Sequence, residues 1–176
     1  AQTMMDHGIP IGNVGHLVQI PESMVEKIVA YGPEVVTVYS LDKVRSIQQA
    51  AARLQKCQGI LLRVFDEGDM IYSGQTAGFP LSEVERTAET IRKEYPNVQI
   101  KGVTSFPCDL YNGEQGDIEP TANLNTVLKA EEILERMGFS DLLVNTPSAT
   151  CMASIGKIAA QGGNCGEPGH GLTGTT

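Results

Sequence analysis

Short apolar runs rich in β-branched residues alternate along this sequence with longer stretches of helical periodicity. This alternation is typical of βα units, and it limits the chain to an α/β fold with a largely parallel sheet. Strands are predicted at residues 14–20, 34–39, 60–65, 98–103 and 142–145. Helices are predicted at residues 22–30, 41–56, 81–95, 121–137 and 149–160.

The number of βα units leaves two architectures open. The chain has 176 residues, whereas a (β/α)8 barrel needs about 250, so the count of five strands favours an open doubly wound sheet. The loops that follow strands, at 66–78 and 104–118, are long, and the loop from helix to strand at 31–33 is short. This asymmetry predicts a functional face at the carboxyl ends of the strands in either architecture.

Composition excludes several classes of protein. The 13 basic and 21 acidic residues give a net charge of −8, which argues against nucleic acid or an anionic membrane as the partner. No apolar run approaches the roughly 20 residues that cross a bilayer. The four cysteines form no CxxC pair, so we expect reduced thiols, a cytoplasmic location and no metal site. The GxGxxG and GxxxxGK[ST] nucleotide patterns are also missing.

The segment 163–176 is rich in glycine, which lets a backbone approach a ligand closely and direct its amides toward it. Glu167 and His170 flank a Pro-Gly turn in this segment, so an acid and a cation could serve opposite ends of one ligand. A flexible tail is the alternative that composition alone leaves open.

A second anion site is predicted just before the last helix. Thr146 suits the N-cap of that helix and Pro147 its first position. The amides of Ser148 and Ala149 would then be available to an anion such as phosphate.

Several ordered motifs resemble one family. The segment GEPGH at 166–170 is similar to the GEPGR motif of ornithine-decarboxylase-like enzymes and to the RPG segment of alanine racemases, which are fold-type III pyridoxal-phosphate enzymes. Arg63 lies in a segment that resembles a barrel strand of that family. Together with HLVQ at 16–19, GxTxFPC at 102–108 and PSATC at 147–151, the chain most resembles the YhfX-type branch of predicted amino-acid racemases.

The resemblance implies a barrel and reverses the preference for an open sheet. Residues 1–176 would form a partial (β/α)8 TIM-type barrel of the alanine racemase N-terminal type, with about strands 3 to 8 of the eight. The chain would enter at a helix over residues 1–7. The first barrel strands and the family's C-terminal β domain would lie outside it, as in an internal fragment.

The resemblance also implies pyridoxal 5′-phosphate as the cofactor and gives roles to residues of this chain. Glu167 would lie beside the pyridine nitrogen, where a carboxylate favours a protonated ring. The phosphate would be held by His170, by Gly169 and by the amides after Ser148. Arg63 would lie near the phenolic oxygen, unless it is paired structurally inside the barrel. The full set of expected cofactor-binding residues is Glu167, Gly169, His170, Ser148, Ala149, Thr150, Arg63, His16 and Ser105.

Two features depart from the family pattern. Where the family places a histidine against the cofactor ring, this chain has Ser105-Phe106-Pro107. Either Phe106 has taken over the stacking role or another strand supplies it. The covalent lysine of the family ends the first barrel strand, which we expect to precede Ala1. The catalytic residues therefore stay unassigned, and we expect the fragment alone to be inactive.

The function expected from the resemblance is that of an amino-acid racemase or epimerase, an isomerase that abstracts the α-proton of a cofactor-bound amino acid. Two alternatives remain open. One is a non-catalytic module that binds phosphate or pyridoxal phosphate, and the other is a decarboxylase-type enzyme of the same fold. One expected partner is a small amino-acid substrate. A second copy of the chain is also expected, because six of eight barrel strands leave two open sheet edges that can pair with another chain.

Overall fold

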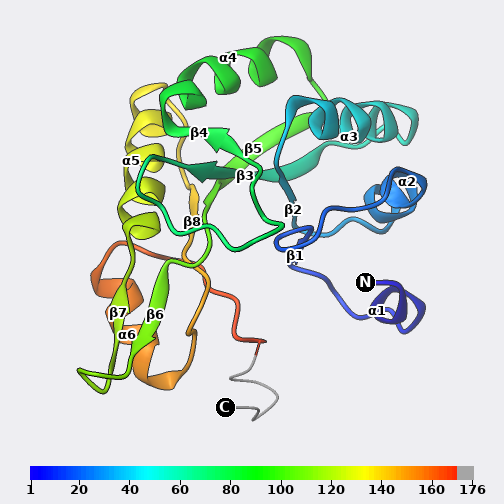
Figure 1. Cartoon of the computed structure of the whole chain (residues 1–176). Helices are drawn as coiled ribbons and strands as arrows, with labels where there is room; N and C mark the ends of the chain where they lie inside the picture. The colour runs from blue at the N-terminus through cyan, green and yellow to red at the C-terminus, as the bar shows by residue number, and fades with distance from the viewer. Residues whose placement is uncertain (170–176) are drawn as a thin grey trace.

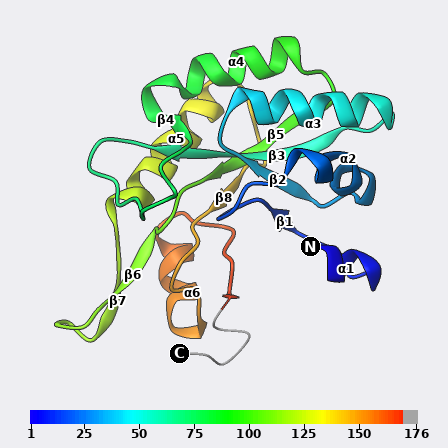
Figure 2. The same cartoon turned by 45° about the vertical axis from the view of Figure 1, so that its right-hand side comes forward.

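The computed structural model describes residues 1–169 of the chain, and its centre is a parallel sheet that curls into a half-barrel (Figures 1 and 2). The strand order along the sheet is β1-β2-β3-β5-β8, and β4 pairs with β3 off this path. Cys165 extends the sheet by a parallel bridge to Asn145. The bounds of these strands are Asn13–Val14 (β1), Val35–Val38 (β2), Gln58–Phe65 (β3), Phe79–Pro80 (β4), Val98–Thr104 (β5) and Leu143–Asn145 (β8). The partial barrel predicted from the resemblance is confirmed.

Helices line the outer side of the curl, and α6 and a β-hairpin lie below it (Figure 1). The outer helices are α2 (Glu22–Tyr31), α3 (Leu41–Arg53), α4 (Val84–Glu94) and α5 (Ala122–Arg136). A short 3-10 helix, η1 (Leu81–Glu83), leads into α4, and α1 (Gln2–Asp6) precedes β1. Below the sheet, α6 (Met152–Ala160) lies beside an antiparallel hairpin of β6 (Asp109–Asn112) and β7 (Asp117–Pro120). Within residues 1–169, no helix combines the length and apolar character needed to cross a membrane.

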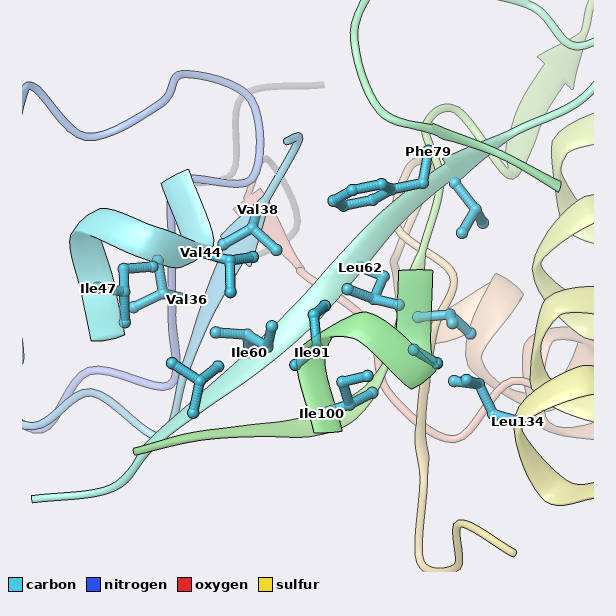
Figure 3. Packing of buried hydrophobic residues seen from close by; sticks show 14 of the residues in the cluster. Val36, Val38, Val44, Ile47, Ile60, Leu62, Phe79, Ile91, Ile100 and Leu134 are labelled. Carbon is cyan, nitrogen blue, oxygen red and sulfur yellow. The ribbon is translucent and has the colours of Figure 1, made fainter. Parts of the chain in front are cut away.

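The hydrophobic core lies between the sheet and the outer helices. Ile60, Leu62 and Val64 of β3 are fully buried in it, alternating with residues of the opposite face. Val44 and Ile47 of α3 pack against β2 and β3 in the same layer, as Figure 3 shows. The period of three and four that predicts α3 therefore marks its buried side.

The strand predicted at 14–20 is wrong for most of its length. Only Asn13–Val14 pairs with β2, and Gly15 then turns the chain with φ +91°. The Gln19 side chain donates hydrogen bonds to the carbonyl oxygens of Gly15 (2.8 Å) and Thr37 (3.0 Å), which holds the rest as a loop. Val18 is 82% exposed there, so the apolar run does not mark a buried strand.

The predicted start of the last helix is also wrong. The helix begins at Met152, and Cys151 is its N-cap in a reciprocal pair with Ser154, whose hydroxyl oxygen accepts a hydrogen bond from the Cys151 N–H (2.9 Å). Ser148 and Ala149 have φ angles of +105° and +47°, so neither belongs to a right-handed helix. The β6–β7 hairpin, residues 109–120, occupies most of the segment predicted as a loop at 104–118 and was not predicted from the sequence.

Substitution of Gly102 tests whether β5 and β8 are in close contact. A Cβ atom at this position would lie 2.0 Å from the Leu143 carbonyl oxygen, so Gly102→Ala should lower the free energy of unfolding by about 3 kcal/mol. Gly156→Ala is the control, because a Cβ there meets nothing within 4 Å and alanine favours a helix interior by up to about 1 kcal/mol. Chemical denaturation measures both, and equal stability of Gly102→Ala and the unchanged chain would contradict the contact.

Candidate functional site

A row of polar residues crosses the inner face of the half-barrel at the carboxyl ends of its strands. The parallel register pairs Arg63 of β3 with Thr104 of β5, and Thr104 with Asn145 of β8. These three residues are at most 1% exposed and lie on the face opposite the apolar core. Strands buried on both faces are normally apolar throughout, so a buried polar row indicates a functional face.

Arg63 is a buried cation without an anionic partner. Its Nη2 donates a hydrogen bond to the Phe106 carbonyl oxygen (3.1 Å), and its guanidinium lies 5.5 Å from the centre of the Tyr39 ring. Nε and Nη1 have no hydrogen-bond partner, and no carboxylate of residues 1–169 forms an ion pair with the side chain. Burial lowers the pKa of this guanidinium, yet arginine stays charged in proteins. An anion is therefore the group this position lacks.

His16 contacts Phe106 and Tyr39, which also contact Arg63, and neither of its ring nitrogens has a hydrogen-bond partner in the described part of the chain. It is 7% exposed, and its ring meets Phe106 edge to face at 5.6 Å between centroids. The Tyr39 hydroxyl donates a hydrogen bond to the His16 carbonyl oxygen, which fixes the loop after β1. Burial lowers the pKa of His16, against an opposing effect of Glu167, and Arg63 lowers it further. The neutral imidazole is thus favoured, with a donor and an acceptor to offer.

Glu167 joins the two ends of the curled sheet. One of its oxygens, Oε1, accepts hydrogen bonds from the side-chain amides of Asn13 (2.7 Å) and Asn145 (2.9 Å). Asn13 begins β1, and Glu167 follows Cys165 beyond β8. The predicted acid of the site therefore lies at the carboxyl ends of the strands, within reach of the polar row.

The segment 146–150 carries further unpartnered polar atoms beside the glycine-rich segment. The hydroxyl oxygens of Thr146 and Thr150 are buried and form no hydrogen bond with any residue of 1–169. A Cβ atom on Gly163 would lie 2.5 Å from the Thr146 hydroxyl oxygen, and one on Gly166 would lie 3.1 Å from Thr150 Cγ2. Glycine is required for this close approach. The two segments that the sequence marks for phosphate are thus in contact.

Asn123 of α5 forms hydrogen bonds with the loop after β3 and with the segment after β5. Its side chain exchanges two hydrogen bonds with the backbone of Met70, each 3.0 Å long, and its Nδ2 also donates to the Ser105 hydroxyl oxygen (3.1 Å). Tyr72, from the same loop as Met70, lies with its ring 5.7 Å from that of Phe106. The loop after β3 is therefore held over the segment after β5.

The structure gathers most of the predicted residues at one rim. Arg63, His16 and Glu167 lie there, as do Ser148, Ala149 and Thr150 on the loop after β8. Ser105 is buried and engaged with α5 through Asn123. Gly169 donates its N–H to the Glu167 carbonyl oxygen (2.9 Å), and His170 lies outside the described residues. The cofactor roles of all nine stay predictions.

All seven lysines fall within the described residues, and none lies in the polar row. Lys101 is the one on a strand, but it is exposed and lies at the irregularity in the β3–β5 register. It stands three residues before Thr104, about 10 Å along the strand. The position of the covalent lysine expected from the resemblance stays a prediction.

Sequence reasoning missed five residues of the rim, namely Asn13, Thr37, Tyr39, Thr104 and Asn145. Thr37, Thr104 and Asn145 are polar residues inside or at the end of otherwise apolar strands, whereas Asn13 begins the two-residue β1 and Tyr39 follows β2. That pattern could have found the first three, because an apolar environment tolerates a polar side chain only where it is hydrogen-bonded. His16 contacts the Phe106 ring from the loop after β1, and whether either ring takes the stacking role of the family's histidine stays a prediction.

The family model described as alanine racemase, N-terminal domain, matches residues 1–176. The chain belongs to this family. It is 38% identical over 175 residues to the uncharacterized protein YhfX of Escherichia coli (strain K12), a match that covers 99% of this chain and 45% of YhfX. The chain therefore spans less than half the length of this relative.

Solved structures show the same fold. PipY of Synechococcus elongatus PCC7942, determined with PLP bound, superposes with a TM-score of 0.62 at 14% identity, over 94% of this chain and 71% of PipY. The alanine racemase of Clostridium difficile 630 superposes with a TM-score of 0.52 at 20% identity, over 75% of this chain and 33% of the racemase.

Asn123→Ala should release the loop after β3. The change leaves the Met70 N–H and carbonyl groups without their partner, which should lower the free energy of unfolding by about 2 kcal/mol and speed amide hydrogen exchange at Met70. Asn125→Ala, at an exposed position of the same helix, is the matched control and should change neither. Unaltered exchange at Met70 in the Asn123 variant would show that the loop is held by other contacts.

His16 should make the chain less stable in acid. Because burial lowers its pKa below the ordinary 6.5, the unfolded chain binds the proton first as the pH falls. The free energy of unfolding contributed by neutral His16 is complete above pH 6.5 and is lost as the pH drops toward the lowered pKa, by at most about 1.4 kcal/mol per pH unit.

Denaturation at pH 7.5 and 5.5 measures this loss in the unchanged chain and in two variants. His16→Leu should remove this part of the pH dependence, whereas His7→Leu, at an exposed position, should retain it. An identical pH dependence in His16→Leu and the unchanged chain would contradict a buried neutral imidazole.

Proposed function

We propose that this chain forms the pyridoxal 5′-phosphate-binding half-barrel of an amino-acid isomerase of the racemase or epimerase type. The observation that carries the proposal is the buried guanidinium of Arg63, whose Nε and Nη1 have no partner among residues 1–169. An unpaired buried cation costs several kcal/mol, and an anionic ligand would offset that cost. The family of the chain and the PLP bound in PipY indicate which anion to test.

The unpartnered groups at the rim suit this cofactor in kind. Arg63 offers two donors to an anionic oxygen, and His16 offers a donor and an acceptor beside it. Thr146 and Thr150 offer hydroxyl groups next to the glycine-rich segment, where a phosphate requires several donors. Glu167 supplies a carboxylate for the nitrogen of a pyridine ring. The residues present therefore fit an aromatic ligand that carries a phosphate, an anionic oxygen and a basic nitrogen.

Residues of this chain would bind and orient such a ligand in distinct ways. Arg63 would hold the phenolic oxygen, and the segment of Ser148, Ala149 and Thr150 would hold the phosphate, with Gly169 nearby. The left-handed φ angles of Ser148 and Ala149 are sparsely populated conformations that occur preferentially at ligand clamps. Bound pyridoxal phosphate withdraws electrons from the α-carbon of an amino acid, which makes its hydrogen acidic.

A non-catalytic binding module is the second candidate. The observation that favours it is the position of the seven lysines, all described and all away from the polar row. A chain without a lysine at the rim would bind pyridoxal phosphate without a covalent bond. The two candidates agree on the ligand and differ on whether an amino acid reacts.

Titration with pyridoxal phosphate, followed by the cofactor's absorbance, tests the binding. The unchanged chain should bind it, and Arg63→Met should weaken binding by about tenfold or more, the value of a charge-assisted hydrogen bond. The ligand-free Arg63→Met chain should be at least as stable as the unchanged one, since it no longer buries an unpaired charge. Arg45→Met, which removes an exposed arginine, should bind normally. Equal affinity of the Arg63 variant would refute the assignment.

Borohydride reduction tests whether a lysine of this chain joins the cofactor. After reduction of the chain with pyridoxal phosphate at equal concentrations, mass spectrometry should show no cofactor mass on any lysine-containing peptide. A modified Lys101 would contradict the proposed non-covalent binding, because it would place a reactive amine on the inner face.

A further inference from the structure

Within residues 1–169, only one of the two carboxylate oxygens of Glu167 accepts hydrogen bonds. Oε1 accepts two hydrogen bonds, from Asn13 Nδ2 at 2.7 Å and from Asn145 Nδ2 at 2.9 Å. Among residues 1–169, no hydrogen bond to Oε2 is present, and no lysine or arginine forms an ion pair with the carboxylate. The second oxygen is therefore available as an acceptor for a ligand.

The two asparagine side chains are themselves fixed in orientation. The Thr37 hydroxyl donates a hydrogen bond to Asn13 Oδ1 (3.0 Å), so the amide nitrogen of Asn13 faces the other way, toward Glu167. Asn145 Nδ2 donates to both the Thr104 hydroxyl oxygen (3.0 Å) and Glu167. Thr37 and Thr104 are fully buried on regular strands, so both donors are in place before any ligand binds.

Amide donors differ from cations in what they do to a carboxylate. A lysine or arginine beside Glu167 would compensate its negative charge, whereas two neutral amides orient the carboxylate without cancelling that charge. The arrangement suits an acceptor whose full charge acts on a ligand proton. The pyridine nitrogen of the proposed cofactor can carry such a proton.

We propose that Asn13 and Asn145 are positioning residues that hold the Glu167 carboxylate as the acceptor for the protonated ring nitrogen of pyridoxal phosphate. The inference rests on the proposed cofactor and adds that two amides, drawn from the first and last strands of the half-barrel, set the protonation of the bound ring. Thr37 and Thr104 do not contact Glu167 themselves; their hydroxyl groups orient the two amides by hydrogen bonds.

The ligand-free chain tests the amide pair. In nitrogen-15 NMR spectra, Glu167→Ala should shift the side-chain amide resonances of Asn13 and Asn145 together. Glu26→Ala, which alters an exposed carboxylate paired with Arg53, should shift neither. If the two asparagine resonances do not respond to Glu167→Ala, the pair does not exist and the inference fails whether or not the cofactor binds.

Pyridoxal phosphate labelled with nitrogen-15 in its ring tests the role. Bound to the unchanged chain at pH 7.5, the ring nitrogen should resonate in the protonated range. Asn13→Leu and Asn145→Leu should each raise the dissociation constant about tenfold and move the resonance toward the unprotonated range. Thr37→Val should move it in the same direction by less, and it keeps the size of the side chain if the leucine variants fold poorly. Asn125→Leu, on the exposed side of α5, should bind as the unchanged chain does.

Each outcome bears on a separate claim. If the unchanged chain does not bind pyridoxal phosphate, the proposed cofactor and this inference both fall. If it binds with a protonated ring and the asparagine and threonine variants keep that resonance, the cofactor stands and the positioning role is wrong. Weaker binding without a shift of the resonance would likewise overturn the inference, since it would reveal a merely structural effect.

Discussion

The parallel register of the sheet is the constraint on which the rest of this molecule depends. It pairs Arg63 with Thr104 and Thr104 with Asn145, so residues far apart in sequence form one row at the carboxyl rim. The same register sends Ile60, Leu62 and Val64 to the helix side, where they are fully buried in the core. One face of each strand therefore stabilises the fold while the other presents chemistry.

The polar face carries an energetic conflict that a ligand would relieve. Buried polar groups are normally hydrogen-bonded, yet Arg63, His16 and Thr146 keep unpartnered atoms in the described part of the chain. Arg63 adds a buried charge without an anion. Features that reduce the stability of a ligand-free chain are retained where function requires them. The unpartnered atoms of these three residues lie at one rim, where a bound anionic cofactor would supply partners for them. Other unpartnered atoms, on Gln75, Asp109 and Gln161, belong to other segments.

Periodicity predicted the helices well because their buried sides repeat at three and four residues, as in α3. The apolar pattern gave wrong predictions where a local contact or backbone angle determined the conformation instead. Gly15 and the Gln19 side chain turn the apolar run after Val14 into a loop, and the left-handed φ at Ser148 delays the last helix to Met152. Motifs located Arg63 and Glu167, but the partners of Glu167 lie 154 and 22 residues away. Only the curl of the sheet brings them together, and no local pattern encodes that distance.

A crystal structure of the chain with pyridoxal phosphate tests the central claim most directly. The account predicts the cofactor at the carboxyl rim, with an oxygen on Arg63 and its ring nitrogen on Glu167. Two open surface hollows of about 440 and 480 Å³ offer other locations, the first lined by Gly8, Pro10 and Tyr31 and the second by Leu41, Phe79 and Arg86. Cofactor in either hollow, with Arg63 still unpaired, would contradict the account.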